Sequence, residues 1–216
     1  MIDRTGALRI SLGLALGFLL VAALVRGGLI QGLDAAGLRA AAALRGPILT
    51  TLVRGVTRLG SGSALFPAAV VFAAVLWRRG ARWALFYLVA ALAGWGLSSG
   101  LKALFARPRP TVTTHLDGAG WWSFPSGHTM ESTVVLGLGI LLVTGWMRNR
   151  GAARLARVIT AVVLMAIGLS RVYLGVHYPS DVLGGWLAGG AWISGMLAFF
   201  SAGRAELHPV SPPGTS

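Results

Sequence analysis

The sequence predicts an all-α integral membrane protein built as a bundle of six transmembrane helices. Of its 216 residues, 55% are hydrophobic and only 12% are charged, and the mean hydropathy is +0.73, which is too apolar for an ordinary water-soluble domain. Six apolar stretches are each long enough to cross about 30 Å of hydrocarbon. Helix is the state expected for them, because an open strand would leave backbone groups unpaired in lipid.

The six stretches occupy most of the chain. They are residues 10–25, 61–77, 83–101, 130–147, 155–169 and 182–200. We therefore expect residues 1–200 to form a single six-span domain. Residues 201–216 are polar and rich in proline, a composition that is typical of a disordered tail.

Arginines in the short connections predict the orientation in the membrane. They crowd the connection between the second and third stretches and the one between the fourth and fifth: Arg78, Arg79, Arg82, Arg148, Arg150, Arg154 and Arg157. Cytoplasmic loops are enriched in Lys and Arg, so both termini are expected in the cytoplasm and segments 26–60, 102–129 and 170–181 outside. This arrangement also accounts for the formal net charge of +13. Because the arginines do not gather on one polar face, no nucleic-acid partner is expected.

Segment 26–60 mixes arginines with alanine and leucine. This pattern is typical of amphipathic helices that lie at the level of the lipid headgroups. We expect an interfacial cover for the bundle; the alternative is that these arginines attract anionic lipid toward a binding site.

The first cluster of polar residues follows the third stretch and reads Lys-Ala-Leu-Phe-Ala-Arg-Pro-Arg-Pro over residues 102–110. Lys102 is the only lysine in the chain. Pro108 and Pro110 cannot continue a helix, so Arg109 is expected on an extended segment that reaches back toward Lys102. Two cations held in this way can bind the oxygens of one phosphate. Snorkelling of basic side chains at the membrane interface is the alternative.

The second cluster lies directly before the fourth stretch and reads Ser-Phe-Pro-Ser-Gly-His-Thr over residues 123–129. A proline followed by small residues indicates a helix start, where free backbone amides bind anions. Ser126 and the Gly127 amide are therefore candidate ligands of phosphate oxygens, and Gly127 allows close approach of the backbone. His128 then lies beside the same anion; as a single histidine it could equally be an ordinary hydrogen-bonding residue.

The third cluster joins the fifth and sixth stretches and contains Ser170-Arg171 and, further on, His177-Tyr178-Pro179-Ser180-Asp181. Pro179 is expected to open the sixth helix, with Asp181 in its first turn, where the helix dipole favours a carboxylate. Asp181 then comes within hydrogen-bonding reach of His177. A carboxylate on one ring nitrogen fixes the tautomer of a histidine and leaves the other nitrogen free to attack.

Read together, the clusters give Lys-x6-Arg-Pro, Pro-Ser-Gly-His and Ser-Arg-x5-His-x3-Asp, in this order. This pattern, from Lys102 to Asp181, resembles the signature of the type 2 phosphatidic acid phosphatase superfamily, whose bacterial membrane members have a similar six-span layout. The resemblance implies that His177 attacks phosphorus to form a phosphohistidine, that Asp181 orients it and that His128 protonates the leaving oxygen. It also implies a set of residues that hold the phosphoryl oxygens: Lys102, Arg109, Ser126, Gly127 and Arg171.

The expected function is hydrolysis of a phosphate monoester or pyrophosphate on a membrane lipid. Phosphatidylglycerol phosphate, undecaprenyl pyrophosphate and phosphatidic acid are all candidate substrates. No metal or cofactor is expected, because three cations and the helix-start amides supply the positive charge. By resemblance, the protein is expected in a bacterial inner membrane, with the site facing the periplasm or exterior.

Two other functions use the same residues. A lipid phosphotransferase would pass the phosphoryl group to an acceptor other than water. A lipid or anion transporter would use the basic residues as a binding site, but it has no need for a His177–Asp181 pair together with a second histidine.

Among neighbouring polar residues, Asp117 is expected in a solvated loop, and Arg107 lies outside the signature but could assist phosphate binding.

Overall fold

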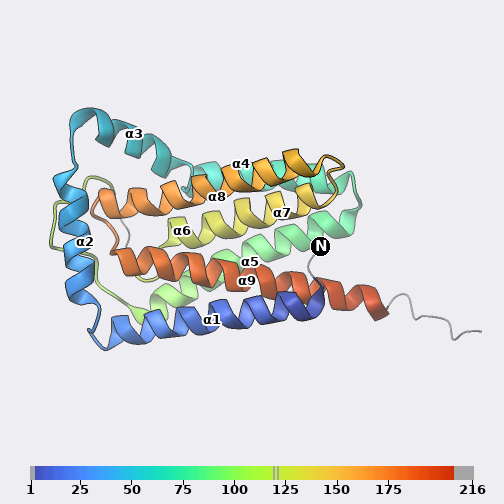
Figure 1. Cartoon of the computed structure of the whole chain (residues 1–216), viewed down its shortest axis with the longest axis horizontal. Coiled ribbons are helices and arrows are strands. Elements are labelled where there is room, and N and C mark those ends of the chain that lie inside the picture. Colours follow the sequence, from blue (N-terminus) through green and yellow to red (C-terminus); the bar gives the residue numbers. More distant parts are fainter. Residues whose placement is uncertain (1–2, 119, 121, 207–216) are drawn as a thin grey trace, which may run out of the picture.

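The computed structural model describes residues 3–118, 120 and 122–206, and all regular secondary structure in these residues is helical. The elements in chain order are α1 (Arg4–Arg26), α2 (Gln31–Ala43), α3 (Pro47–Arg58), α4 (Gly62–Trp77), α5 (Ala81–Phe105), α6 (Gly127–Ser132), the π-helical η1 (Thr133–Gly137), α7 (Leu138–Gly145), α8 (Arg150–Tyr173) and α9 (Pro179–Glu206). Figure 1 shows the long helices running side by side, with α2 lying across one end. The prediction of an all-α bundle is confirmed.

Five helical stretches in the described part of the chain are long and apolar enough to cross a membrane: Arg4–Arg26, Ala81–Phe105, Gly127–Gly145, Arg150–Tyr173 and Pro179–Phe200. The pair α3 and α4 passes the same test when taken together, with a bend of 44° at the break between them. If this pair is counted as one span, the described residues contain six candidate spans. The expected second span corresponds to α4, which has only 16 residues, fewer than the roughly 20 that a span needs. α3, the last part of the expected interfacial segment, adjoins α4 at this bend.

The helix starts follow the sequence signals. The sixth span, α9, begins at Pro179 with Asp181 in its first turn, and α6 begins at Gly127 directly after its N-cap residue, Ser126. At its other end α9 continues through Glu206, into the segment expected to be a tail. The remaining tail residues, 207–216, lie outside the described residues.

Glycines bring α9 close to α6 and η1. A Cβ atom on Gly185 would lie only 2.8 Å from Cβ of Thr129, and one on Gly189 only 2.9 Å from Cβ of Thr133. Small residues at such positions allow two helix backbones to approach closely. The starts of α6 and α9 are joined directly, because the Ser126 amide donates a hydrogen bond to the Asp181 carbonyl at 2.9 Å.

The helix α2 packs on the ends of α8 and α9. Its Leu38 is fully buried in a cluster with Val172 of α8 and Val182 of α9. This packing brings Asp34, which is only 1% exposed, to the first turn of α9. Figure 1 shows that the same end of the bundle holds the last turn of α5 and the starts of α6 and α9. The three polar clusters therefore lie at one end, and the arginine-rich connections lie at the other.

Candidate active site

All eight residues of the predicted site lie together at the α2 end of the bundle. Six of them line a pocket of about 460 Å³, which we call the catalytic pocket: Lys102, Arg109, Gly127, His128, Arg171 and His177. The other two, Ser126 and Asp181, are fully buried and reach the pocket through their neighbours. Residues from four helices and two loops thus converge on a space that is large enough for a phosphate group.

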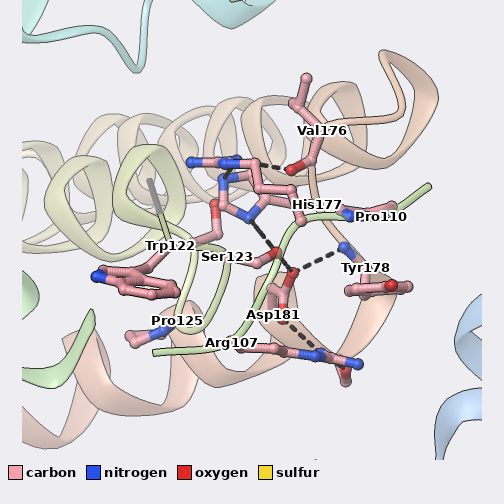
Figure 2. Close-up of polar contacts among 12 residues, drawn as sticks. Arg107, Pro110, Trp122, Ser123, Pro125, Val176, His177, Tyr178 and Asp181 are labelled. Carbon is pink, nitrogen blue, oxygen red and sulfur yellow. Dashed lines mark hydrogen bonds and ion pairs between the residues drawn. The ribbon is translucent and has the colours of Figure 1, made fainter. Parts of the chain in front are cut away.

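His177 and Asp181 are paired at the base of the catalytic pocket. His177 Nδ1 is 3.4 Å from Asp181 Oδ2, and Figure 2 shows the imidazole ring above this carboxylate. The Tyr178 amide donates to the same oxygen at 2.8 Å, and the Ser123 hydroxyl donates to it as well. These donors fix the carboxylate. With the Nδ1 proton directed at Asp181, the lone pair of His177 is on Nε2, at the side of the ring where Arg109 lies.

Burial keeps the His177 ring neutral. The residue is 2% exposed, and this burial lowers the pKa of His177 to about 3, although the hydrogen bond and charge of Asp181 favour the protonated ring. A neutral imidazole can attack without first losing a proton. The pairing therefore provides a nucleophile that is ready at neutral pH.

Arg109 stands directly in front of this nucleophile. Its Nη1 atom is 3.0 Å from His177 Nε2 and donates to the Val176 carbonyl at 2.6 Å. The Nε atom donates to the Gly120 carbonyl at 2.7 Å, so both edges of the guanidinium are held. A phosphoryl group that approaches Nε2 is therefore within reach of Arg109.

Lys102 and Gly127 lie next to each other in the lining of the catalytic pocket. The Lys102 ammonium donates to the Pro125 carbonyl at 2.8 Å and to the Trp122 carbonyl at 3.2 Å, which ties the segment before α6 to the last turn of α5. A Cβ atom on Gly127 would lie 3.2 Å from Lys102 Cε, so glycine lets the lysine lie against the helix start. The Ser126 hydroxyl accepts a hydrogen bond from Thr129 at 3.0 Å. Gly127, and not this hydroxyl, lines the pocket.

Asp117 lies in a loop, as the sequence predicts, but it is paired with a residue of the predicted site. Its carboxylate accepts a hydrogen bond from Arg171 Nη1 at 2.6 Å, and its side chain is 36% exposed. Although partial burial opposes ionisation, the hydrogen bond and charge of Arg171 hold the pKa of Asp117 below its usual value. The same Arg171 atom donates to Thr57 at 2.7 Å. Asp117 and Thr57 thus position Arg171, a proposed phosphate ligand. The sequence around these two residues gives no signal that they contact Arg171.

We call the predicted catalytic residues His177, His128 and Asp181 the triad. Arg107 and Asp34 form a second network behind it, which the sequence did not predict. Arg107 Nη1 donates to Asp181 Oδ1 at 2.6 Å, and Arg107 Nη2 donates to Asp34 Oδ2 at 2.7 Å. Figure 2 shows Arg107 on the side of Asp181 that faces away from His177. Asp34 also accepts hydrogen bonds from the amide and hydroxyl of Ser180, at 2.9 and 2.5 Å.

This network explains the position of Asp181. Asp34 satisfies a first-turn amide of α9 from a different helix, as a capping residue does within one chain segment. Arg107 is only 10% exposed and lies between two carboxylates, with its guanidinium 4.0 Å from the centre of the Tyr178 ring. It does not line the catalytic pocket. Its contacts therefore support the triad carboxylate instead of the phosphate.

Comparisons with known proteins identify the family of the chain. Residues 80–204 match the PAP2 superfamily model. The chain belongs to the PAP2 superfamily. It is 33% identical to phosphatidylglycerophosphatase B of Bacillus subtilis over 185 residues, which is 85% of this chain and 88% of that protein. A shorter stretch of 75 residues, 34% of this chain and 31% of that protein, is 44% identical to undecaprenyl-diphosphatase of Sulfolobus acidocaldarius.

The fold also matches a solved PAP2 structure. A crystal structure of a transmembrane PAP2-type phosphatidylglycerolphosphate phosphatase from Bacillus subtilis superposes with a TM-score of 0.79 at 30% identity, covering 92% of this chain and 96% of that one. The chain is thus a PAP2 phosphatase with the architecture of its membrane relatives. The matched region contains all eight residues of the predicted site.

Proposed function

We propose that this PAP2 phosphatase removes phosphate from a membrane lipid, and that the reaction passes through a phosphohistidine on His177. The observation that supports this most strongly is the geometry of His177, with Nδ1 next to the Asp181 carboxylate and Nε2 next to Arg109, in a pocket that Lys102 and Arg171 also line. A transport site needs charge but no oriented nucleophile.

In the first step, His177 Nε2 forms a bond to phosphorus while the bond from phosphorus to the leaving oxygen breaks. His128, which lines the same pocket, enters this step as the protonated imidazolium and donates a proton to that oxygen. Lys102, Arg109 and Arg171, together with the backbone at Gly127, hold the phosphoryl oxygens as charge develops on them. Asp181 stabilises the positive charge that the His177 ring acquires.

In the second step, water attacks the phosphohistidine. His128 has lost its proton in the first step and now takes one from the attacking water. The bond between phosphorus and Nε2 breaks, and inorganic phosphate leaves. A phosphotransferase would differ only in the acceptor, so release of free phosphate distinguishes the two reactions.

The membrane arrangement is part of the proposal. We place both termini in the cytoplasm and the catalytic pocket at the outer face of a bacterial inner membrane, because the arginine-rich connections lie at the opposite end of the bundle. Residues 1–200 form the catalytic domain in this arrangement, and residues 201–216 lie outside it.

A panel of lipid phosphates tests the proposed function. Purified protein in detergent is expected to release phosphate from phosphatidylglycerol phosphate, undecaprenyl pyrophosphate or phosphatidic acid, and kcat/KM should rank them. If none of these lipids yields free phosphate, the proposal is refuted.

Activity is also expected to survive metal chelation. Three cationic side chains line the catalytic pocket and can stabilise the transferring phosphoryl group as Mg²⁺ does in other enzymes. Phosphate release should be the same with and without EDTA. If EDTA abolishes activity and added Mg²⁺ restores it, the proposal that cationic side chains supply the positive charge is wrong.

A further inference from the structure

A second cavity opens beside the catalytic pocket. It has a volume of about 990 Å³ and lies between α3, the turn from α3 to α4 and the loop at 115–118; we call it the outer cleft. Its polar lining includes Arg54, Thr57, Arg58, Ser61, Asp117 and His128. His128 and Gly118 line both cavities. The outer cleft and the catalytic pocket are therefore neighbours that meet at His128.

The outer cleft carries a net positive charge. Asp117 is the only carboxylate in its lining, and Arg171 already neutralises it at 2.6 Å. Arg54 uses two nitrogen atoms to donate to the Leu116 carbonyl, at 3.3 and 3.0 Å, which holds its guanidinium at the cleft wall. Within the described part of the chain, no hydrogen bond or ion pair engages the guanidinium of Arg58. Two arginines thus remain available to an anion.

The position of the outer cleft relative to His128 indicates what enters it. The turn from α3 to α4 is fixed against this histidine, since a Cβ atom on Gly60 would lie 3.4 Å from His128 Cβ. In the proposed reaction His128 protonates the leaving oxygen, so the rest of the substrate extends from the catalytic pocket past this ring. The first groups beyond the scissile bond therefore meet the outer cleft and its arginines.

We infer that the outer cleft binds a second phosphate of the substrate, the one that stays on the leaving group. This inference rests on the proposed function and narrows its substrate class. Phosphatidylglycerol phosphate carries such a phosphate beyond a glycerol, and a lipid pyrophosphate carries it directly. Phosphatidic acid carries none. Guanidinium groups bind phosphate oxygens through charge-assisted hydrogen bonds, so lipids with two phosphates are the preferred substrates.

The test measures selectivity in a neutral detergent. The readout is kcat/KM for each two-phosphate lipid, divided by kcat/KM for phosphatidic acid. In Arg58→Gln this ratio is expected to fall about tenfold, the usual size of one lost charge-assisted hydrogen bond, and Arg58→Lys should recover part of it. The matched control is Arg39→Gln, an exposed arginine on α2 that does not line the cleft; its ratio should equal that of the unaltered protein.

Each outcome has a defined meaning. Separate ratios for phosphatidylglycerol phosphate and undecaprenyl pyrophosphate show which spacing between phosphates the cleft accepts. An unchanged ratio in Arg58→Gln, or a parallel loss for all three lipids, overturns the inference. A third result would also overturn the inference: added phosphatidylserine inhibits the unaltered protein competitively, and Arg58→Gln abolishes this inhibition. The outer cleft would then bind a neighbouring anionic lipid and not a phosphate of the substrate. Absence of phosphate release by the unaltered protein refutes the proposed function itself.

Discussion

Replacing His177 by alanine is expected to abolish phosphate release, lowering kcat by at least about 10³-fold, because the proposed reaction then lacks the group that forms the covalent intermediate. The ring is buried, and both of its nitrogen atoms have defined neighbours, Asp181 on one side and Arg109 on the other. A short incubation with ³²P-labelled substrate should label the unaltered protein with an acid-labile, base-stable phosphate. His177→Ala should show no such label.

The controls separate the nucleophile from the other histidines. His128→Ala should lower the rate about 10²- to 10⁴-fold, the usual contribution of a general acid or base. His208→Ala, in the polar C-terminal segment, should behave like the unaltered protein. All variants should elute from a sizing column as the unaltered protein does. Near-normal turnover in His177→Ala would exclude this residue as the nucleophile.

Arg107→Gln is expected to lower both stability and kcat. The change leaves Asp34 and Asp181 buried without their shared cation, and removing one partner of a buried ion pair costs about 3–5 kcal/mol. The unfolding midpoint in detergent should fall. Among variants that remain folded at the assay temperature, kcat should fall while KM changes little, since Arg107 lies outside the lining of the catalytic pocket.

Further variants distinguish positioning from general stability. Adding Asp34→Asn to Arg107→Gln removes one uncompensated charge and should restore part of the stability, but kcat should stay low because Asp181 Oδ1 still lacks its partner. Arg107→Lys should retain part of kcat. The matched control is Arg39→Gln on the exposed side of α2. If Arg107→Gln leaves kcat unchanged, or lowers it only in proportion to the folded fraction, Arg107 has no positioning role.

Most of the architecture could be predicted from the sequence because it depends on local patterns. Apolar length predicts the spans, and Pro179 and Ser126 mark helix starts that the structure contains. The second span was harder to place. α4 is too short by itself to cross a membrane, and it passes as a candidate span only together with α3. The two helices are bent at the break between them, and the apolar pattern of the sequence does not predict this bend.

The grouping of the eight predicted site residues at one end of the bundle could be expected from the sequence for a similar reason. Their spacing is local within each cluster, as for His177 and Asp181, which are one helical turn apart. The supporting network was not predictable, because Asp34 and Ser180 are 146 positions apart in the chain. The one available signal was a lone acidic residue in an apolar, arginine-containing segment, since such a charge needs a partner when it is buried. Its partner could be identified only once α2 had been placed across the end of α9.

The glycine contacts between α6 and α9 limit how far these two helices can move relative to each other. At Gly185, the backbone of α9, which carries Asp181, packs directly on α6, which begins at Gly127. No side chain separates the two helices at this position. The contact therefore fixes the spacing between the first turn of α9, which holds the carboxylate that pairs with His177, and the start of α6. Since a displacement of about 1 Å can cost roughly 10²-fold in rate, this direct contact helps a site drawn from four helices and two loops to keep its alignment within a fluid bilayer.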